Sequence, residues 1–204
     1  MKIILVRHGK TQSNREHRYL GRTDEPLCEQ GMEELTQKMR RGFYPQTPDR
    51  VVCSPMRRCI QTAAWICPKG YPYRIEDDLR ETNFGIFEGK TYEELKGDLD
   101  YQRWLASNGE GPIPQGESRM QMCARCLAGF ERQVACALQE GKEELLFVVH
   151  GGSIMAILER YAQPAQPFYA FHVDNGDGYI LEIPDGQPLH GRYPVQKLGE
   201  EENK

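Results

Sequence analysis

The stretch KIILVRHGKTQSN, residues 2–14, decides the fold of this chain of 204 residues. Its apolar run at 3–6 contains β-branched residues and does not alternate, which is typical of a strand buried on both faces of a parallel sheet. Arg7, His8 and Gly9 follow the run directly. Open α/β sheets bind ligands beyond the carboxyl ends of their strands. The stretch therefore places a guanidinium and an imidazole where such a sheet would bind a ligand.

Strand-like and helical patterns alternate along the rest of the chain, which favours a three-layer α/β/α sandwich with a mostly parallel central sheet. Short apolar runs predict further strands at 50–54, 71–75, 145–149, 168–173 and 178–183. Helical spacing predicts helices at 29–41, 55–67, 91–96, 98–107, 117–140 and 151–161. We expect a single domain over 1–204, with an insertion at about 76–115 that covers one end of the sheet and a polar, loosely held tail from about 185.

The composition, 39% hydrophobic and 27% charged residues, is that of an ordinary globular protein. The net charge of −4 argues against general binding to nucleic acids or membrane surfaces. No apolar run approaches the roughly 18 residues that a membrane span needs, and the first strand begins too early to leave room for a signal peptide. We therefore expect a cytoplasmic protein.

Seven scattered cysteines do not suggest a disulfide framework in a chain long enough to bury a core. The pair Cys123-x-x-Cys126 lies inside a helical pattern, and no second pair has the spacing of metal ligands. The sequence therefore predicts packing cysteines rather than a metal site.

The N-terminal 24 residues carry six basic side chains against two acidic ones, so they form either a solvated basic loop or a site for a small anion. The strand at 145–149 also ends in a histidine and a glycine, His150 and Gly151, and Arg58 follows the strand at 50–54 within a helical turn. If these strands are parallel, Arg7, Arg58, His8 and His150 converge on one crevice. Two guanidiniums and two imidazoles suit a dianion, because the planar fork of arginine bonds phosphate oxygens in pairs.

Four motifs occur in order between residues 3 and 152: Arg7-His8-Gly9-x-Thr11-x-x-Asn14, Ser54-x-Met56-x-Arg58-x-x-Gln61-Thr62-Ala63, Arg80-Glu81-x-Asn83-Phe84-Gly85-x-Phe87-Glu88-Gly89 and Val149-His150-Gly151-Gly152. Together they resemble the histidine phosphatase (phosphoglycerate mutase-like) superfamily.

The resemblance implies that His8 is a nucleophile that forms a phosphohistidine and that Glu81 is the proton donor. It also implies that Arg7, Arg58 and His150 hold the phosphoryl oxygens. Asn14, Gly21, Arg22 and Gly151 complete the expected phosphate site and its rim. The resemblance implies no metal and no other cofactor. The partner is then a small-molecule phosphomonoester, and a homodimer is compatible with this expectation.

The compact insertion with NFGIFEG resembles the phosphatase branch rather than the mutases, which have a longer insertion. Within that branch, residues 19–27 and 171–176 are similar to α-ribazole phosphatases, so a nucleoside-like 5′-phosphate is the leading substrate. A cofactor-dependent phosphoglycerate mutase, a broad-specificity phosphatase and an inactive phospho-ligand binding module remain alternatives. Retention of the proton donor Glu81 speaks against a pure binding module.

The other polar residues near these motifs receive plainer interpretations. We expect Glu88 to support the fold through hydrogen bonds, and Lys10 either to tune phosphate affinity or to point into solvent. Surface or structural roles are expected for Arg57, His17, His172 and His190. Aromatic residues of the insertion are expected to pack it onto the core rather than contact substrate: Phe84, Phe87, Tyr92, Tyr101 and Trp104.

Overall fold

The computed structural model describes residues 1–184 and 189–200. Within these residues, a central sheet of seven strands has the order β3-β2-β4-β1-β6-β7-β5. The strands are β1 (Lys2–Arg7), β2 (Arg50–Cys53), β3 (Tyr73–Ile75), β4 (Glu144–Val149), β5 (Ala162–Gln163), β6 (Gly178–Glu182) and β7 (Tyr193–Lys197).

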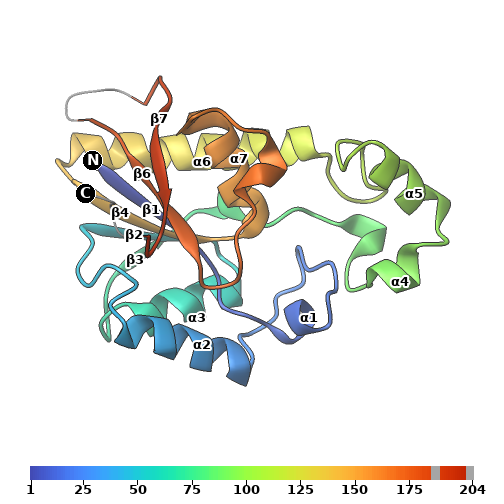
Figure 1. Cartoon of the computed structure of the whole chain (residues 1–204), viewed down its shortest axis with the longest axis horizontal. Coiled ribbons are helices and arrows are strands. Elements are labelled where there is room, and N and C mark those ends of the chain that lie inside the picture. The colour runs from blue at the N-terminus through green and yellow to red at the C-terminus, as the bar shows by residue number, and fades with distance from the viewer. Residues whose placement is uncertain (185–188, 201–204) are drawn as a thin grey trace.

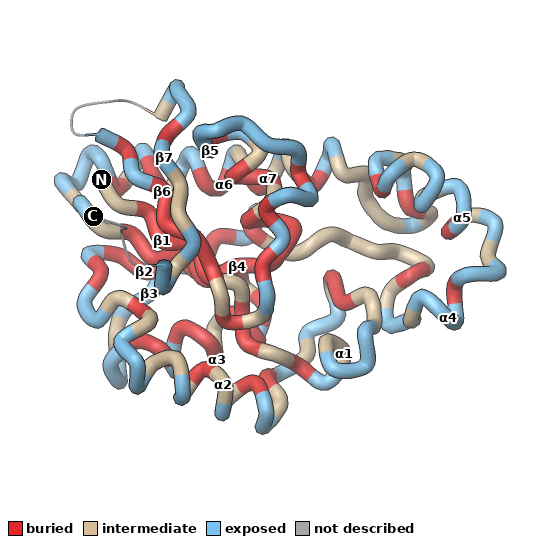
Figure 2. The backbone as a smooth tube through the Cα atoms, viewed as in Figure 1, coloured by how far each residue is buried: buried red, intermediate tan, exposed pale blue. Residues whose placement is uncertain are grey.

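Helices cover both faces of the sheet, which confirms the predicted three layers (Figure 1). One apolar cluster joins the sheet to α6 (Arg119–Gln139) and α7 (Gly151–Tyr161), and another joins it to α2 (Glu29–Arg40) and α3 (Arg57–Ile66). The inner strands β1, β2, β4 and β6 are largely buried between these layers, as Figure 2 shows, whereas the edge strand β3 is exposed. The α3 helix begins two residues later than expected, since Met56 occupies its N-cap position.

The parallel half of the sheet follows the predicted strands and fixes which residues meet at its edge. In the ladder between β1 and β4, Arg7 lies opposite Val149, and in the ladder between β2 and β4, Cys53 lies opposite Val148. The next residues along the chain are His8, His150 and Ser54. They therefore leave neighbouring parallel strands at nearly the same level.

Two predictions for the C-terminal part are wrong. Residues 168–173 do not form a strand: 168–171 form a 3₁₀ helix, η3 (Phe168–Phe171), in which Phe168 and Phe171 are both buried. A spacing of three residues brings these rings to one face of a 3₁₀ turn, whereas in a strand they would point to opposite faces.

The expected loose tail contains an ordered strand. β7 pairs antiparallel with β6, and Tyr193 is buried in the core. Part of that predicted tail, 185–188 and 201–204, lies outside the described residues.

The segment expected as an insertion lies beyond the carboxyl ends of the parallel strands (Figure 1). Its four short helices are η1 (Asp77–Leu79), η2 (Gly85–Phe87), α4 (Tyr92–Leu95) and α5 (Leu99–Ala106). Phe87, Leu95, Tyr101 and Ile113 form its own apolar cluster, against which Tyr19, Phe84 and Trp104 pack. The aromatic residues therefore pack within the insertion rather than onto the core as predicted; Phe84 and Trp104 also line a cavity, and Tyr92 is more than half exposed.

The seven cysteines are free thiols. Cys126 is buried in an apolar cluster with Met122, Ala156 and Phe168, against which Cys123 packs. The described residues contain no cluster of three or more His, Cys, Asp or Glu side chains arranged to bind a metal ion. They also contain no helix with the length and apolar character required to cross a lipid bilayer.

Candidate active site

His8 lies just past the end of β1 and is almost completely buried. Its Nδ1 is 2.7 Å from the carbonyl oxygen of Gly9. Because a carbonyl can only accept, Nδ1 carries the proton and Nε2 keeps its lone pair. Burial, together with the charges of Arg58 and Arg7, holds the pKa of His8 well below its ordinary value. The ring is therefore neutral at pH 7 and has one nitrogen available as a nucleophile.

Arg7 and Arg58 bring two guanidiniums to this edge of the sheet. Arg7 ends β1 and donates from Nη1 to the carbonyl of Val173 at 2.7 Å. Arg58, fully buried on α3, donates to the carbonyls of Gly21 and Thr23 at 2.8 and 2.9 Å. The Nε atoms of both arginines are buried and have no hydrogen-bond partner among the described residues. Unpaired buried donors are costly, so these two atoms are candidate donors for an anionic ligand.

His150 follows β4 and is packed against His8, with their ring centroids 5.2 Å apart. Its Nε2 is 2.7 Å from the hydroxyl of Ser54, and the Cys59 thiol lies 3.5 Å from the same nitrogen. Burial, then the charge of Arg58, lowers the pKa of His150 well below its ordinary value. Two neutral imidazoles therefore lie side by side.

Glu81 comes from the insertion and reaches the N-terminus of α7. Its carboxylate accepts from its neighbour Thr82 at 2.8 Å and from the backbone N–H of Gly152 at 3.3 Å. A Cβ atom on Gly152 would lie 2.4 Å from Oε1 of Glu81. The glycine is therefore what lets the carboxyl group approach the end of α7.

The expected rim residues surround this centre at different depths. The side-chain oxygen of Asn14 accepts from the backbone of Thr11 and from the Asn175 amide, each at 3.2 Å. Gly151 begins α7, and a Cβ built on it would contact the Arg7 guanidinium at 3.6 Å. Asn14 is thus fixed beside the chain that follows His8, and Gly151 lies beside Arg7.

Gly21 and Arg22 belong to the loop that receives Arg58. A Cβ on Gly21 would lie 1.9 Å from the carbonyl oxygen of Thr82, so only glycine fits there. Arg22 reaches toward Glu117 with an N–O distance of 4.0 Å. Glu88 accepts from the backbone of Gly21 at 2.7 Å, and this confirms its predicted role in supporting the fold.

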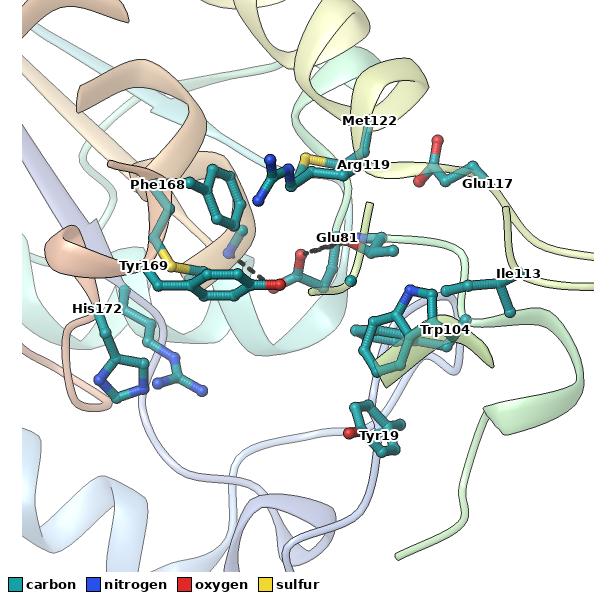
Figure 3. A pocket seen from close by; sticks show the side chains of 17 residues that line it. Tyr19, Glu81, Trp104, Ile113, Glu117, Arg119, Met122, Phe168, Tyr169 and His172 are labelled. Atoms are coloured by element: carbon teal, nitrogen blue, oxygen red, sulfur yellow. Dashed lines mark hydrogen bonds between the residues drawn. The ribbon is translucent and has the colours of Figure 1, made fainter. Parts of the chain in front are cut away.

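A cavity of about 360 Å³ adjoins the charged centre (Figure 3). Arg7 and Glu81 form part of its wall, whereas His8, Arg58 and His150 do not line it. Trp104 and Ile113 lie on one side of Glu81 in Figure 3, Phe168 and Tyr169 lie on the other, and Met122 lies above it beside Arg119. The cavity is therefore largely apolar and aromatic, with the expected proton donor among its lining residues.

Some residues of this wall were missed by sequence reasoning. Arg119 lines the cavity and lies over the rings of Phe168 and Tyr169, 5.1 and 5.8 Å from their centroids. Its spacing of three residues from Met122 on one helical face is a signal that could have found it. His172, expected at the surface, is exposed but also lines the cavity.

The plainer interpretations are confirmed for Arg57, His17 and His190. All three are exposed, in contrast to the buried Arg58. Lys10 neither contacts the charged centre nor lines the cavity, and it pairs with Glu34 on α2 at 2.8 Å.

Comparison with known proteins agrees with this geometry. The model of the histidine phosphatase superfamily (branch 1) matches residues 3–193. The broad-specificity phosphatase YOR283W of Saccharomyces cerevisiae is 30% identical over 168 residues, which cover 78% of this chain and 69% of that protein.

Two further relatives match nearly the whole chain. The adenosylcobalamin/alpha-ribazole phosphatase of Escherichia coli K12 is 27% identical over 194 residues, 90% of each chain. The crystal structure of the alpha-ribazole phosphatase from Shigella flexneri superposes with a TM-score of 0.79 at 26% identity, covering 98% of this chain and 96% of that one. With the family model matching most of its length, this chain belongs to the histidine phosphatase superfamily, branch 1, and its relatives indicate a phosphatase, a hydrolase.

Proposed function

We propose that the chain is a metal-independent phosphomonoesterase that works through a phosphohistidine on His8. The observation that carries this proposal is the fixed tautomer of His8, a buried neutral ring that leaves Nε2 unprotonated and that feels the charges of Arg58 and Arg7, each with an unpaired Nε. The charge on a transferring phosphoryl group spreads over its outer oxygens, so fixed cations around it lower the barrier. Arg7 and Arg58 supply that charge without a metal ion.

The reaction has two halves. In the first, Nε2 of His8 forms a bond to phosphorus while the ester P–O bond breaks, and the protonated carboxyl of Glu81 gives its proton to the leaving alkoxide. In the second, the carboxylate of Glu81 accepts a proton from water as the water oxygen attacks phosphorus. The P–N bond then breaks, inorganic phosphate leaves, and Glu81 is protonated again. His150, together with Asn14 and the rim, holds the phosphoryl oxygens.

The leading substrate is a nucleoside-like 5′-phosphate such as α-ribazole 5′-phosphate. Supporting this choice, Trp104, Phe168 and Tyr169 offer flat apolar faces beside Glu81, and aromatic faces stack on ring systems. Two of the relatives reported above are alpha-ribazole phosphatases. A broad-specificity phosphatase is the second candidate, because another relative bears that name.

The test is hydrolysis of a panel of phosphomonoesters with EDTA present. We expect activity to survive chelation, and His8→Ala and Arg58→Met to lose it. Arg57→Met is the matched control, because Arg57 is the exposed neighbour of Arg58 and should retain activity. Activity that disappears with EDTA, or that persists in His8→Ala, would overturn the mechanism.

Two further measurements separate the alternatives. Rapid quenching with ³²P-labelled substrate should trap an acid-labile, base-stable phosphoprotein in the wild type and not in His8→Ala. A binding module would trap no label, and a mutase would isomerise 3-phosphoglycerate rather than release phosphate.

A further inference from the structure

Glu81 lies on backbone that has no regular secondary structure of its own. The 3₁₀ helix η1 ends at Leu79, and residues 80–84 belong to neither a helix nor a strand. The two contacts of the Glu81 carboxylate described above involve its neighbour Thr82 and one N–H of α7. Something else must therefore fix the segment on which this side chain is carried.

Arg125, on the face of α6 toward this segment, supplies the missing contacts. Its Nη1 donates to the carbonyls of Asp78 and Arg80 at 2.8 and 2.6 Å, and its Nη2 donates to the carbonyl of Glu81 at 2.9 Å. The side chain is only 18% exposed and does not line the cavity. One guanidinium thus donates hydrogen bonds to three backbone carbonyls within residues 78–81.

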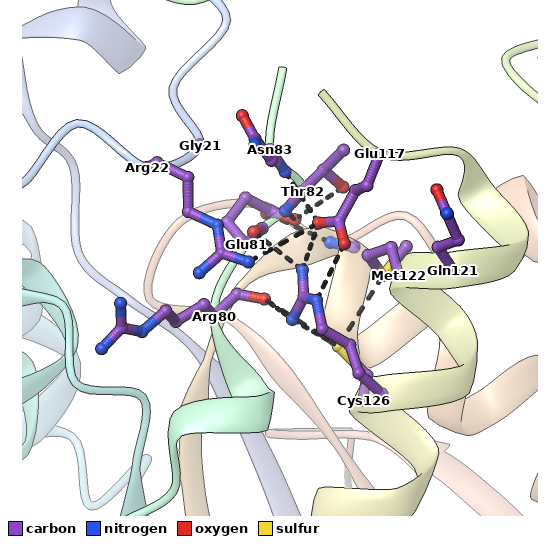
Figure 4. Close-up of polar contacts among 12 residues, drawn as sticks. Gly21, Arg22, Arg80, Glu81, Thr82, Asn83, Glu117, Gln121, Met122 and Cys126 are labelled. Atoms are coloured by element: carbon purple, nitrogen blue, oxygen red, sulfur yellow. Dashed lines mark hydrogen bonds and ion pairs between the residues drawn. The ribbon is translucent and has the colours of Figure 1, made fainter. Parts of the chain in front are cut away.

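Glu117 completes the clamp from the other side. It pairs with Arg125 through both oxygens, and its Oε1 also accepts the backbone N–H of Asn83 at 2.8 Å. Figure 4 shows Glu117 and Asn83 close to Glu81, and it shows Arg22 approaching the carboxylate of Glu117. The ion pair between Arg125 and Glu117 therefore fixes the backbone on both sides of Glu81.

We propose that Arg125 is a positioning residue for phosphoryl transfer, acting through Glu81. This proposal rests on the proposed role of Glu81 as proton donor. Only arginine can serve, because its planar fork carries five donors and a lysine ammonium cannot reach three carbonyls and a carboxylate together. Without Arg125 the fold keeps its core, but the carboxyl loses its place beside the leaving oxygen.

The test uses two esters of similar size that differ in their need for a proton. The alkoxide of p-nitrobenzyl phosphate leaves only when protonated, whereas p-nitrophenolate from p-nitrophenyl phosphate leaves without help. The measurement is kcat/KM, which covers the steps up to release of the alcohol. A displacement of about 1 Å costs on the order of 100-fold. We therefore expect Arg125→Met to lose about that factor with p-nitrobenzyl phosphate and little with p-nitrophenyl phosphate.

Arg132→Met is the matched control. Arg132 lies on the same helix and pairs with Glu76 and Asp78, but it has no contact with residues 80–83. Arg132→Met should lose an ion pair between the same helix and the chain before Glu81, without any selective loss for the p-nitrobenzyl ester. Inhibition by inorganic phosphate should be unchanged in both variants. If Arg125→Met does not fold, Arg125→Lys keeps a charge for Glu117, and the same selective loss is expected of it.

A double variant decides whether Arg125 acts through Glu81. In a Glu81→Gln background, Arg125→Met should cause no additional loss with p-nitrobenzyl phosphate. A loss that adds to that of Glu81→Gln, or one that is equal for the two esters, would overturn the positioning role. If Glu81→Gln alone were as active as the wild type, the proposed proton donor would fail and the role of Arg125 with it. The Glu81→Gln single variant therefore distinguishes failure of the proposed proton donor from failure of the positioning role of Arg125.

Discussion

The buried neutral histidines make the stability of this protein depend on pH. His8 and His150 have pKa values well below the ordinary 6.5 in the folded chain, because burial and the neighbouring arginines disfavour their charged forms. In the unfolded chain both titrate normally and bind protons below about pH 6.5. The unfolded state then binds more protons than the native state, so stability falls as the pH drops through this range.

The size of the effect follows from the number of groups. One proton of difference changes the free energy of unfolding by about 1.4 kcal/mol per pH unit. Between pH 7.5 and 5.5 one such histidine costs roughly 1.4 kcal/mol, and two cost roughly 3 kcal/mol. Glutamates with lowered pKa values, such as Glu76 and Glu117, act mainly below this window.

Urea unfolding at the two pH values, without phosphate in the buffer, measures this difference. His8→Asn should retain about half of it, because one of the two groups is gone. The control is His17→Asn, since His17 is exposed and has a positive φ of 54° that asparagine tolerates. It should retain the whole pH dependence. Equal stability of the wild type at pH 7.5 and 5.5, or a full effect in His8→Asn, would refute the reasoning.

Two substitutions test the packing described above. In Gly21→Ala the new methyl would lie 1.9 Å from the carbonyl oxygen of Thr82. We expect the free energy of unfolding to fall by about 1–3 kcal/mol, and kcat/KM to fall because the Gly21 carbonyl that accepts from Arg58 is displaced. The control is Gly97→Ala, whose new methyl meets nothing within 4 Å and which should match the wild type in both assays. Tyr193→Ala removes a buried core ring and should lower the free energy of unfolding by about 3–5 kcal/mol. A change below about 0.5 kcal/mol is typical of a surface position. It would contradict the packing of β7 and favour the loosely held tail expected from the sequence.

The parallel half of the sheet could be predicted because its signals are local. The strands containing Ile3 and Leu146 are continuous apolar runs, and such runs need both faces covered. Once the strands are parallel, the histidines after them must lie at one edge. The sequence therefore predicted that His8 and His150 would meet, and the structure confirms their contact.

The strand β7 and the 3₁₀ helix η3 could not be predicted, although β6 was, because their stability comes from distant partners. β7 contains Pro194, which argues against a strand, and its apolar residues are few. Its ladder with β6 covers 195–197, so the proline lies outside that ladder and pairs only with the short β5. At 168–173 the short apolar run fitted a strand, but burial of Phe168 and Phe171 together favoured a 3₁₀ turn.

The stacking of Arg119 in the cavity wall was also missed from the sequence. Arg119 and Tyr169 are about fifty residues apart, and nothing in the sequence around either residue indicates that they stack. The clamp of Arg125 was missed for a different reason. It contacts backbone carbonyls, and those contacts leave no pattern of side-chain types in the sequence.

The division between the charged centre and the cavity has a consequence for divergence. His8, Arg58 and His150 lie outside the wall, while Trp104, Tyr169 and their neighbours form it. A substitution among the apolar residues of the wall can thus alter which ester is accepted without replacing a bond-breaking group, whereas Arg7 and Glu81, which also line it, must be kept. Laboratory evolution of specificity should therefore begin with these apolar residues.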